Sequence, residues 1–328
     1  KHQTLLCFTG SGKTCTVANV VQNIQKATLV LVHNKTLAAQ LCSEFQEYFP
    51  DNAVSYFVSY YDYYQPEAYL PRTDTYIEKD ASINEEIDKL RHAATHNLLT
   101  RNDVLIVASV SAIYGIGDVE SYKKLALEVK VGDTIVRNEL LRKLTDLQYS
   151  RSHMEFKQGM FHVLGDVVEI IPPSSDNMIR LEFFGDEVEQ RNGPALTRGE
   201  VINDLDKFKI FPAKHAVTTK EKSDRSVKEI QKDLEIRYKE LKKMGKDIEA
   251  ERLKTRTEYD IEIMLETGYC SGIENYVRYL NGSKPDTPPS TLINYFPDDF
   301  LTFIDESHMT IPQLNGMYNG NYARKTTL

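Results

Sequence analysis

The chain has 328 residues, of which 48 are acidic and 40 are basic, so its net charge is −8. At roughly 100–200 residues per domain, this length indicates two or three domains. A protein that binds nucleic acid over its whole surface is normally basic, so any nucleic-acid contact here must be local or depend on aromatic stacking. No apolar run approaches the ~18 residues of a membrane helix, and no secretory signal opens the chain. The four cysteines form no CxxC pair or metal motif, so we expect reduced thiols in a cytoplasmic protein with no membrane partner.

The first 110 residues alternate between apolar runs and helical patterns. The runs at 4–8, 27–33 and 104–108 predict buried strands, and the first of them leads into a glycine-rich turn. Residues 36–49 carry apolar side chains at helical spacing. Continuous apolar strands that alternate with helices are typical of a parallel sheet covered on both faces. The sequence therefore predicts an α/β domain over residues 1–117.

Two different patterns follow, and then the first one returns. Residues 160–190 alternate apolar and polar side chains around turns at Gly165, Asp176 and Gly185, which predicts antiparallel hairpins in a β-rich domain at 118–216. Residues 220–262 have interleaved charges and apolar positions every three or four residues, which predicts amphipathic helices broken near Gly245 in a helical domain at 217–290. The dense charge there is expected to be a solvated face. An apolar run at 299–305 predicts that residues 291–328 return to the α/β domain.

A phosphate-binding loop is predicted where the first apolar run meets a helix. Such a loop needs small residues because its backbone N–H groups wrap the phosphates closely. Its lysine supplies a positive charge and its hydroxyl residue holds Mg²⁺. The predicted nucleotide-binding residues are Thr9, Gly10, Ser11, Gly12, Lys13 and Thr14. Cys7 stands where the full motif has its first glycine, and if that position needs a left-handed backbone, the cysteine costs about 1–3 kcal/mol. We therefore expect weakened rather than abolished binding.

A second candidate motif, Asp305 to His308, directly follows the predicted last strand. An aspartate at the carboxyl end of a strand is where P-loop enzymes place a Mg²⁺ ligand, so Asp305 and Thr14 are the expected metal-binding residues. The adjacent Glu306 can orient the attacking water as a general base. The simpler interpretation is a charged turn, but the phosphate loop in the same chain favours catalysis. His308 keeps two interpretations, a link between the nucleotide site and DNA or a cap of the turn.

Seven of the 19 tyrosines lie between residues 56 and 76. Adjacent strand residues point to opposite faces, so the doublets at 60–61 and 63–64 cannot all face one core. One interpretation is a stacking platform for bases, in which each ring contributes about 1–3 kcal/mol and any base is accepted. The alternative is aromatic packing at a seam between domains. The sequence by itself leaves both open.

Taken together, these motifs closely resemble the UvrB family, the damage-verifying subunits of bacterial nucleotide excision nucleases. The matching stretches are residues 9–14, 33–41, 59–95, 107–115, 165–170, 269–276, 295–300, 305–308 and 312–320. The resemblance implies a RecA-like P-loop NTPase domain of superfamily-2 helicase type, interrupted by a small β-rich domain and a helical domain. It implies ATP and Mg²⁺ as cofactors and damaged double-stranded DNA as a partner. It also implies a fragment truncated at both ends, without the second RecA-like domain, so that this chain alone is not expected to turn over ATP efficiently.

The resemblance also assigns sites. Residues 59–83 would form a long β-hairpin that traps one DNA strand, through Tyr60, Tyr61, Tyr63 and Tyr64 at its base and Tyr69 and Tyr76 further along. UvrA would dock on the β-rich domain, where Arg151 and Arg180 are the candidate contacts. His162 and Leu164 stand where the family usually carries basic residues. UvrC would bind mainly outside this chain.

Two alternatives compete with an ATP-dependent repair subunit. Cys7 and the absent second domain are compatible with a degenerate, non-catalytic adaptor that binds only UvrA or DNA. The homologous region of a transcription–repair coupling factor shares the docking module but lacks the tyrosine hairpin and an intact phosphate loop. The tyrosines at 60–64 and Lys13 argue against that second alternative.

Overall fold

The computed structural model describes residues 2–8, 10–70, 72–73, 75–130, 132–152, 156–185, 187–190, 207–217, 220–268, 270, 272–285 and 287–327. The chain divides into two compact units, one formed by Lys1–Ile113 with Leu292–Leu328 and the other by Tyr114–Thr291. Among the described helices, none combines the length and the apolar character needed to cross a membrane.

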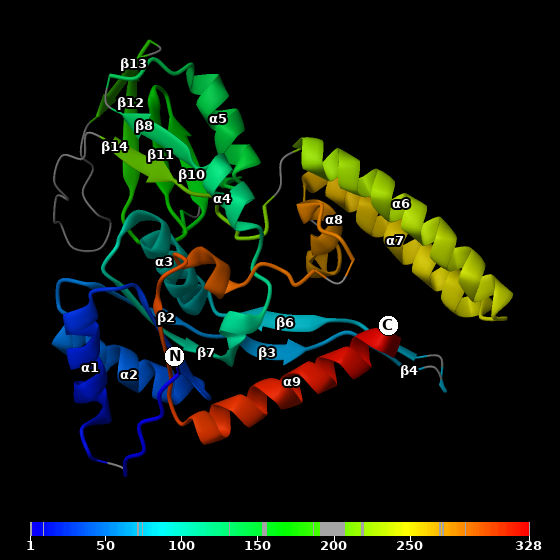
Figure 1. Cartoon of the computed structure of the whole chain (residues 1–328). Coiled ribbons are helices and arrows are strands. Elements are labelled where there is room, and N and C mark those ends of the chain that lie inside the picture. The colour runs from blue at the N-terminus through cyan, green and yellow to red at the C-terminus, as the bar shows by residue number, and fades with distance from the viewer. Residues whose placement is uncertain are drawn as a thin grey trace. The chain divides into compact units, whose positions relative to one another are not determined.

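The first unit is built on a parallel four-stranded sheet in the order β15-β1-β7-β2 (Figure 1). Its strands are β1 (Thr28–Val32), β2 (Ala53–Phe57), β7 (Val104–Ser109) and β15 (Leu301–Ile304). Every residue of β1 and β7 is buried, as expected for central parallel strands covered on both faces. Val30 of β1 pairs with Val107 on one side and Phe303 on the other. The predicted parallel α/β sheet is confirmed.

The helices of the first unit are α1 (Lys13–Ile24), α2 (Lys35–Tyr48), α3 (Glu85–Thr100), α9 (Ser307–Thr327) and the short 3-10 helices η1 (Val110–Ile113) and η3 (Leu292–Tyr295). Of these, α2 and α3 pack against strands of the sheet. Asn34 begins α2 by accepting a hydrogen bond from the Leu37 N–H, and Asn84 begins α3 in the same way, which satisfies amide donors that a helix start leaves open. Phe45 of α2 belongs to the same core cluster as Val32 and Val107.

The predicted strand at residues 4–8 is wrong. Residues 2–8 have no regular structure, and the Leu6 side chain is 95% exposed. An apolar run becomes a strand only by pairing with a neighbouring strand. The described sheet has the order β15-β1-β7-β2, so residues 4–8 pair with none of its strands. The strand β15 is also less buried than expected, because Thr302 and Ile304 are exposed while Leu301 and Phe303 are half-buried.

A long antiparallel hairpin projects from the first unit between β2 and α3. Its lower part pairs β3 (Tyr61–Gln65) with β6 (Asp80–Ile83), and its upper part pairs β4 (Ala68–Leu70) with β5 (Thr75–Ile77). The register of the lower part shifts between Tyr61 and Tyr63, which marks a bulge that bends the strand. The long helix α9 runs along the hairpin and contacts β4 (Figure 1).

The second unit contains a β-rich part and a helical part. A five-stranded sheet has the order β13-β12-β11-β10-β9, and β8 pairs with β14. Its strands are β8 (Leu127–Lys130), β9 (Ser150–Arg151), β10 (Met160–Leu164), β11 (Val167–Ile171), β12 (Ile179–Phe184), β13 (Glu187–Gln190) and β14 (Lys207–Ile210). Its helices are α4 (Val119–Leu125), α5 (Arg137–Asp146), α6 (Lys220–Lys243), α7 (Asp247–Thr267), η2 (Ile273–Asn275) and α8 (Val277–Asn281). The predicted antiparallel hairpins and the break at Gly245, between α6 and α7, are present.

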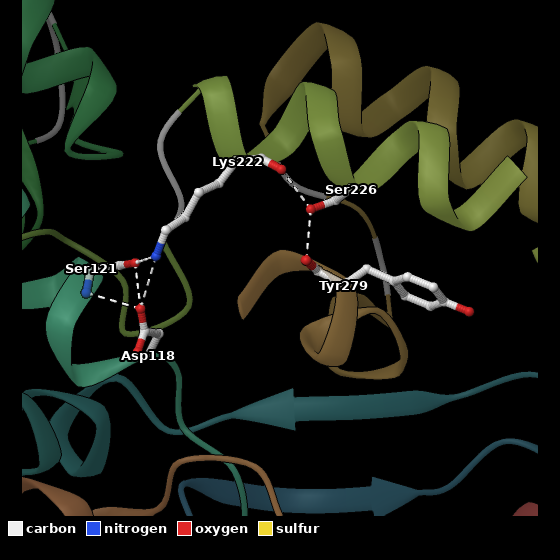
Figure 2. A network of polar contacts seen from close by, with 5 residues as sticks. All are labelled: Asp118, Ser121, Lys222, Ser226 and Tyr279. Atoms are coloured by element: carbon white, nitrogen blue, oxygen red, sulfur yellow. Dashed lines mark hydrogen bonds and ion pairs between the residues drawn. The ribbon is translucent and has the colours of Figure 1, made fainter. Parts of the chain in front are cut away.

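A polar network joins α4, α6 and α8 within the second unit (Figure 2). The Lys222 ammonium donates to Asp118 Oδ2 at 3.1 Å and to Ser121 Oγ at 2.6 Å. One turn further along α6, the fully buried Ser226 hydroxyl lies 2.9 Å from the Tyr279 carbonyl oxygen. The Asp118 carboxylate also caps α4 through the Ser121 N–H. The first turn of α6 is therefore fastened to both of its neighbours.

Candidate functional site

The glycine-rich loop lies directly before α1, as predicted. Gly10 and Gly12 have φ angles of +81° and +78°, a left-handed conformation that other residues rarely adopt. A Cβ at either glycine would meet nothing within 4 Å, so the backbone conformation and not crowding calls for glycine there. Gly12 caps α1, so the free N–H groups of the first turn open onto this loop, and such a helix start attracts anions. Thr9 lies outside the described residues, while Ser11 is exposed and Thr14 is half-buried.

The fold brings this loop and the Asp305 motif together. The Lys13 Nζ donates to Glu306 Oε1 at 2.8 Å, although the two residues are 293 positions apart. This hydrogen bond raises the pKa of Lys13 and lowers the pKa of Glu306, so both groups are charged at neutral pH. Both side chains are about one-third exposed, at 32% and 34%, so water and a ligand can reach the pair.

Asp305 is the first residue after β15. Its backbone N–H donates to the Leu31 carbonyl oxygen at 2.9 Å, which continues the pairing of β15 with β1. Burial, and next the charge of Glu306, raises the pKa of Asp305, and the opposing charge of Lys13 only partly offsets these two effects. The described residues contain no cluster of three or more His, Cys, Asp or Glu side chains fit to hold a metal ion. The Asp305 carboxylate and the Thr14 hydroxyl carry oxygen atoms, the type of ligand that Mg²⁺ prefers.

Glu306 is held in an uncommon backbone conformation. Its φ is +44°, which costs a non-glycine residue about 1–3 kcal/mol and is typical of functional sites. The carbonyl oxygen of Glu306 accepts the N–H groups of Met309 and Thr310 at 2.8 and 3.0 Å. The exposed His308 places Nδ1 3.4 Å from Glu306 Oε2. Both oxygens of the Glu306 carboxylate thus have basic neighbours, Lys13 on one and His308 on the other.

The tyrosines at the hairpin base divide into a packed set and an exposed set. The Tyr61 ring lies 4.4 Å from the Tyr60 ring and stacks on the Tyr64 ring at 4.7 Å, measured between centroids. Burial raises the pKa of Tyr60. In contrast, Tyr63 and Tyr64 remain 51% and 45% exposed. Packing accounts for Tyr60 and Tyr61, whereas Tyr63 is open to a partner and Tyr64 is stacked on one side and partly open.

An arginine that the sequence analysis missed supports these rings. Arg91 of α3 is only 5% exposed, and its Nη1 donates to the Val58 carbonyl oxygen at 2.7 Å. Its guanidinium lies 3.9 Å from the Phe57 ring centroid and 4.8 Å from that of Tyr60. The sequence contained an indication of this burial. Arg91 is four residues after Ile87 and three before Ala94, which places it on the apolar face of α3.

The upper hairpin is tied to α9. Tyr69 and Tyr76 lie opposite each other on β4 and β5. The Tyr76 hydroxyl donates to Glu67 Oε2 at 3.0 Å, and Arg324 Nη1 donates to the Glu67 carbonyl oxygen at 2.9 Å. Because α9 starts at Ser307, next to the Asp305 motif, one helix contacts both the candidate nucleotide residues and the hairpin.

The two arginines predicted to bind a partner lie on the β-rich sheet of the second unit. Arg151 is exposed at the end of β9. Arg180 lies 3.4 Å from Glu169 and 3.1 Å from Glu182, so nearby carboxylates already compensate its charge. His162 Nδ1 lies 3.7 Å from the same Glu169, and Leu164 is 55% exposed.

Known protein families match three successive stretches of the chain. Residues 1–111 match the family described as Type III restriction enzyme, res subunit, residues 127–215 match the UvrB interaction domain, and residues 221–282 match the UvrB third helical domain. With the parallel sheet, the first match bears out the expected helicase-like, RecA-like fold class.

Whole-chain relatives point the same way. UvrABC system protein B of Caldicellulosiruptor bescii is 59% identical over 329 residues, and that of Bacillus subtilis is 58% identical over 330 residues. The same protein of Geobacillus kaustophilus is 59% identical over 330 residues. The match covers all of this chain, and the chain spans about half the length of these relatives. Such identity over the whole chain does not favour a degenerate adaptor. The chain therefore matches two UvrB domains and is similar, over its whole length, to about half of UvrABC system protein B.

Proposed function

We propose that this chain is the ATP-binding and DNA-verifying part of a nucleotide excision repair subunit. The single observation that carries the proposal is the 2.8 Å contact between Lys13 and Glu306. It joins a phosphate loop and an acidic strand end in a chain that is 58–59% identical to UvrABC system protein B. A DNA substrate implies that the protein acts in the cytoplasm.

The residues of the first unit have separate tasks in this proposal. The backbone of Gly10 to Gly12 and the Lys13 ammonium bind the phosphates of ATP. Thr14 and Asp305 hold Mg²⁺, and Glu306 orients water and accepts its proton. Bound Mg-ATP would supply the phosphoanhydride whose cleavage drives the verification of DNA. The Lys13 ammonium is hydrogen-bonded to the Glu306 carboxylate, so an incoming phosphate competes with that carboxylate for an ammonium group already positioned at the site.

The hairpin is the proposed DNA-binding element. Tyr63 and Tyr64 present exposed rings next to an inner, packed set, which supports stacking against bases of any sequence. Tyr69 and Tyr76 would extend this contact along the trapped strand. The net charge of −8 is compatible with such a local contact, because stacking does not require a basic surface.

UvrA and UvrC are the proposed protein partners. The match of residues 127–215 to the UvrB interaction domain supports UvrA as the partner of the β-rich part. Arg151 is the better of the two candidate contacts, because Arg180 already faces two carboxylates. UvrC would be recruited mainly by the half of the relatives that this chain does not span.

Nucleotide binding is tested with a fluorescent Mg-ATP analogue at equilibrium. We expect Lys13→Ala to weaken binding by more than about tenfold, because it removes a charge-assisted phosphate contact. The matched control is Lys26→Ala, which removes the Lys26–Asp299 ion pair of the same unit and should leave affinity unchanged. Equal affinity of the Lys13 variant and the native chain would contradict the proposal.

DNA binding is tested separately. Replacing Tyr63 or Tyr64 by alanine should weaken single-strand binding by about 1–3 kcal/mol, whereas the phenylalanine variants should bind normally because the ring is retained. Tyr259→Ala, which removes a still more exposed ring from α7, is the control. A loss in the phenylalanine variants as large as in the alanine variants would exclude stacking as the mode of contact.

A further inference from the structure

A histidine that the proposed function does not use lies level with Glu306. Leu31 of β1 pairs with Ile304 of β15, and the Asp305 N–H still donates to the Leu31 carbonyl oxygen at 2.9 Å. His33 lies one residue beyond the end of β1, and Glu306 lies two residues beyond the end of β15. At the carboxyl edge of a parallel sheet such neighbours face the same ligand space.

The hydrogen bonds around His33 fix its tautomer. The Asn34 Oδ1 accepts the Leu37 N–H at 2.8 Å, which orients the amide so that its Nδ2 faces the ring. That Nδ2 lies 2.9 Å from His33 Nε2. Because an amide nitrogen can only donate, Nε2 must accept, and a ring that accepts at Nε2 is neutral and carries its hydrogen on Nδ1.

The Nδ1–H of His33 is a donor without an acceptor. Its nitrogen is buried and makes no hydrogen bond within the described residues. Buried donors are nearly always paired, and an exception in a functional site asks for an explanation. An acceptor that arrives only in another state of the site is such an explanation.

We propose that His33 is a positioning residue whose Nδ1–H binds the Glu306 carboxylate once Lys13 has turned to the nucleotide phosphates. This proposal rests on the proposed nucleotide site. In the structure Lys13 donates to Glu306 Oε1, and that oxygen loses its donor when the ammonium moves. His33 holds the carboxylate without neutralising it, because a neutral ring replaces a cation. Glu306 is therefore kept in position after Lys13 has moved to the phosphates.

The test is nitrogen-15 and proton NMR of the histidines of this chain, without nucleotide. The native chain should show His33 with its hydrogen on Nδ1. Lys13→Ala releases Glu306, so the Nδ1–H resonance should move downfield as it gains a carboxylate acceptor. Adding Glu306→Gln to Lys13→Ala should reverse most of that displacement, and Lys26→Ala should cause none.

A second variant tests the tautomer itself. Asn34→Asp keeps a good helix cap but cannot donate to Nε2, so the hydrogen should shift from Nδ1 to Nε2. The proposal is overturned if Nε2 carries the hydrogen in the native chain, or if Lys13→Ala leaves the His33 resonance in place. Failure of the proposed function looks different, because the native chain would then not bind the Mg-ATP analogue while the response to Lys13→Ala persisted.

Discussion

The nucleotide side and the hairpin side of the first unit are built in opposite ways. Around the phosphate loop, Leu6 and Phe8 are 95% and 78% exposed, and Lys13 and Glu306 meet in a pair that water can reach. At the hairpin base, Arg91 is 5% exposed between two aromatic rings. One region uses a single open ion pair, and the other uses a buried cation with a fixed hydrogen bond.

The difference shows how each region can act. An exposed ion pair contributes little to stability, so a ligand can replace it at low cost. A buried guanidinium stacked on rings is held by several contacts at once and is costly to displace. The nucleotide side is therefore suited to exchange partners, and the hairpin base is suited to keep its shape while bases press on Tyr63 and Tyr64.

The largest expected effect is on the hairpin base. Arg91→Ala should lower the free energy of unfolding by about 2–3 kcal/mol, because it removes two cation–π contacts and leaves the Val58 carbonyl oxygen without its donor. Burial also lowers the pKa of Arg91 to about 10, so part of the loss is recovered when the desolvated charge is removed. Urea unfolding measures the change. The control is Arg101→Ala, an exposed partner of Asp103, for which we expect less than about 1 kcal/mol. An equal loss of unfolding free energy in the two variants would contradict the difference between the buried and the exposed arginine.

The next effect is a loss of stability in acid. Burial, and next the charge of Arg91, lowers the pKa of His92 to about 3 from 6.5. Below pH 6.5 the unfolded chain takes up a proton that the folded chain refuses, so stability falls as the pH drops. Between pH 6.5 and about pH 5 the loss should be about 2 kcal/mol. His92→Gln should make this part of the profile shallower, although some slope should remain because burial also lowers the pKa of His96, whereas the exposed His308→Gln should not change it. A native profile that is flat in this range would contradict the burial argument.

The sequence predicts the elements whose signal is local. Continuous apolar runs gave β1 and β7, alternation with glycine turns gave β10 to β13, and GSGKT marked the start of α1. The run at residues 4–8 failed because a strand needs a neighbour, which a local pattern cannot supply. The two motifs together predicted that the phosphate loop and the Asp305 motif meet, but no local pattern indicates the particular contact between Lys13 and Glu306, which lie 293 positions apart.

Arg91 and His33 show a different limit. A charged residue on the apolar face of a helix can be solvated, paired or buried, and only the positions of Phe57 and Tyr60 decide that Arg91 is buried. The role of His33 depends on an amide orientation and on the register of β1 with β15, neither of which composition or periodicity contains.

A smaller effect is expected where α9 holds the hairpin. Arg324→Ala removes the hydrogen bond to the Glu67 carbonyl oxygen, which should open the upper hairpin by about 1 kcal/mol. Hydrogen exchange should become faster for amides of β4 and β5 and stay unchanged for α3. Asn321→Ala, which removes a different hydrogen-bond partner of Arg324, is the matched control. Faster exchange throughout the first unit would mean that the contact is structural for the whole unit.

The smallest expected change in nucleotide binding is at Cys7. It tests whether the exposed segment before the phosphate loop must adopt a particular backbone conformation. Among the described non-glycine residues only Gln25, Gln148 and Glu306 have a positive φ, so the backbone at Cys7 carries no left-handed strain for glycine to relieve. Cys7→Gly only makes an already exposed segment more flexible, which costs about 0.5–1 kcal/mol and should weaken binding of the Mg-ATP analogue by no more than about fivefold. If glycine instead strengthens binding tenfold or more, the bound loop requires a conformation that cysteine resists. The nucleotide side would then be a constrained site that this chain only partly retains, and not an open one.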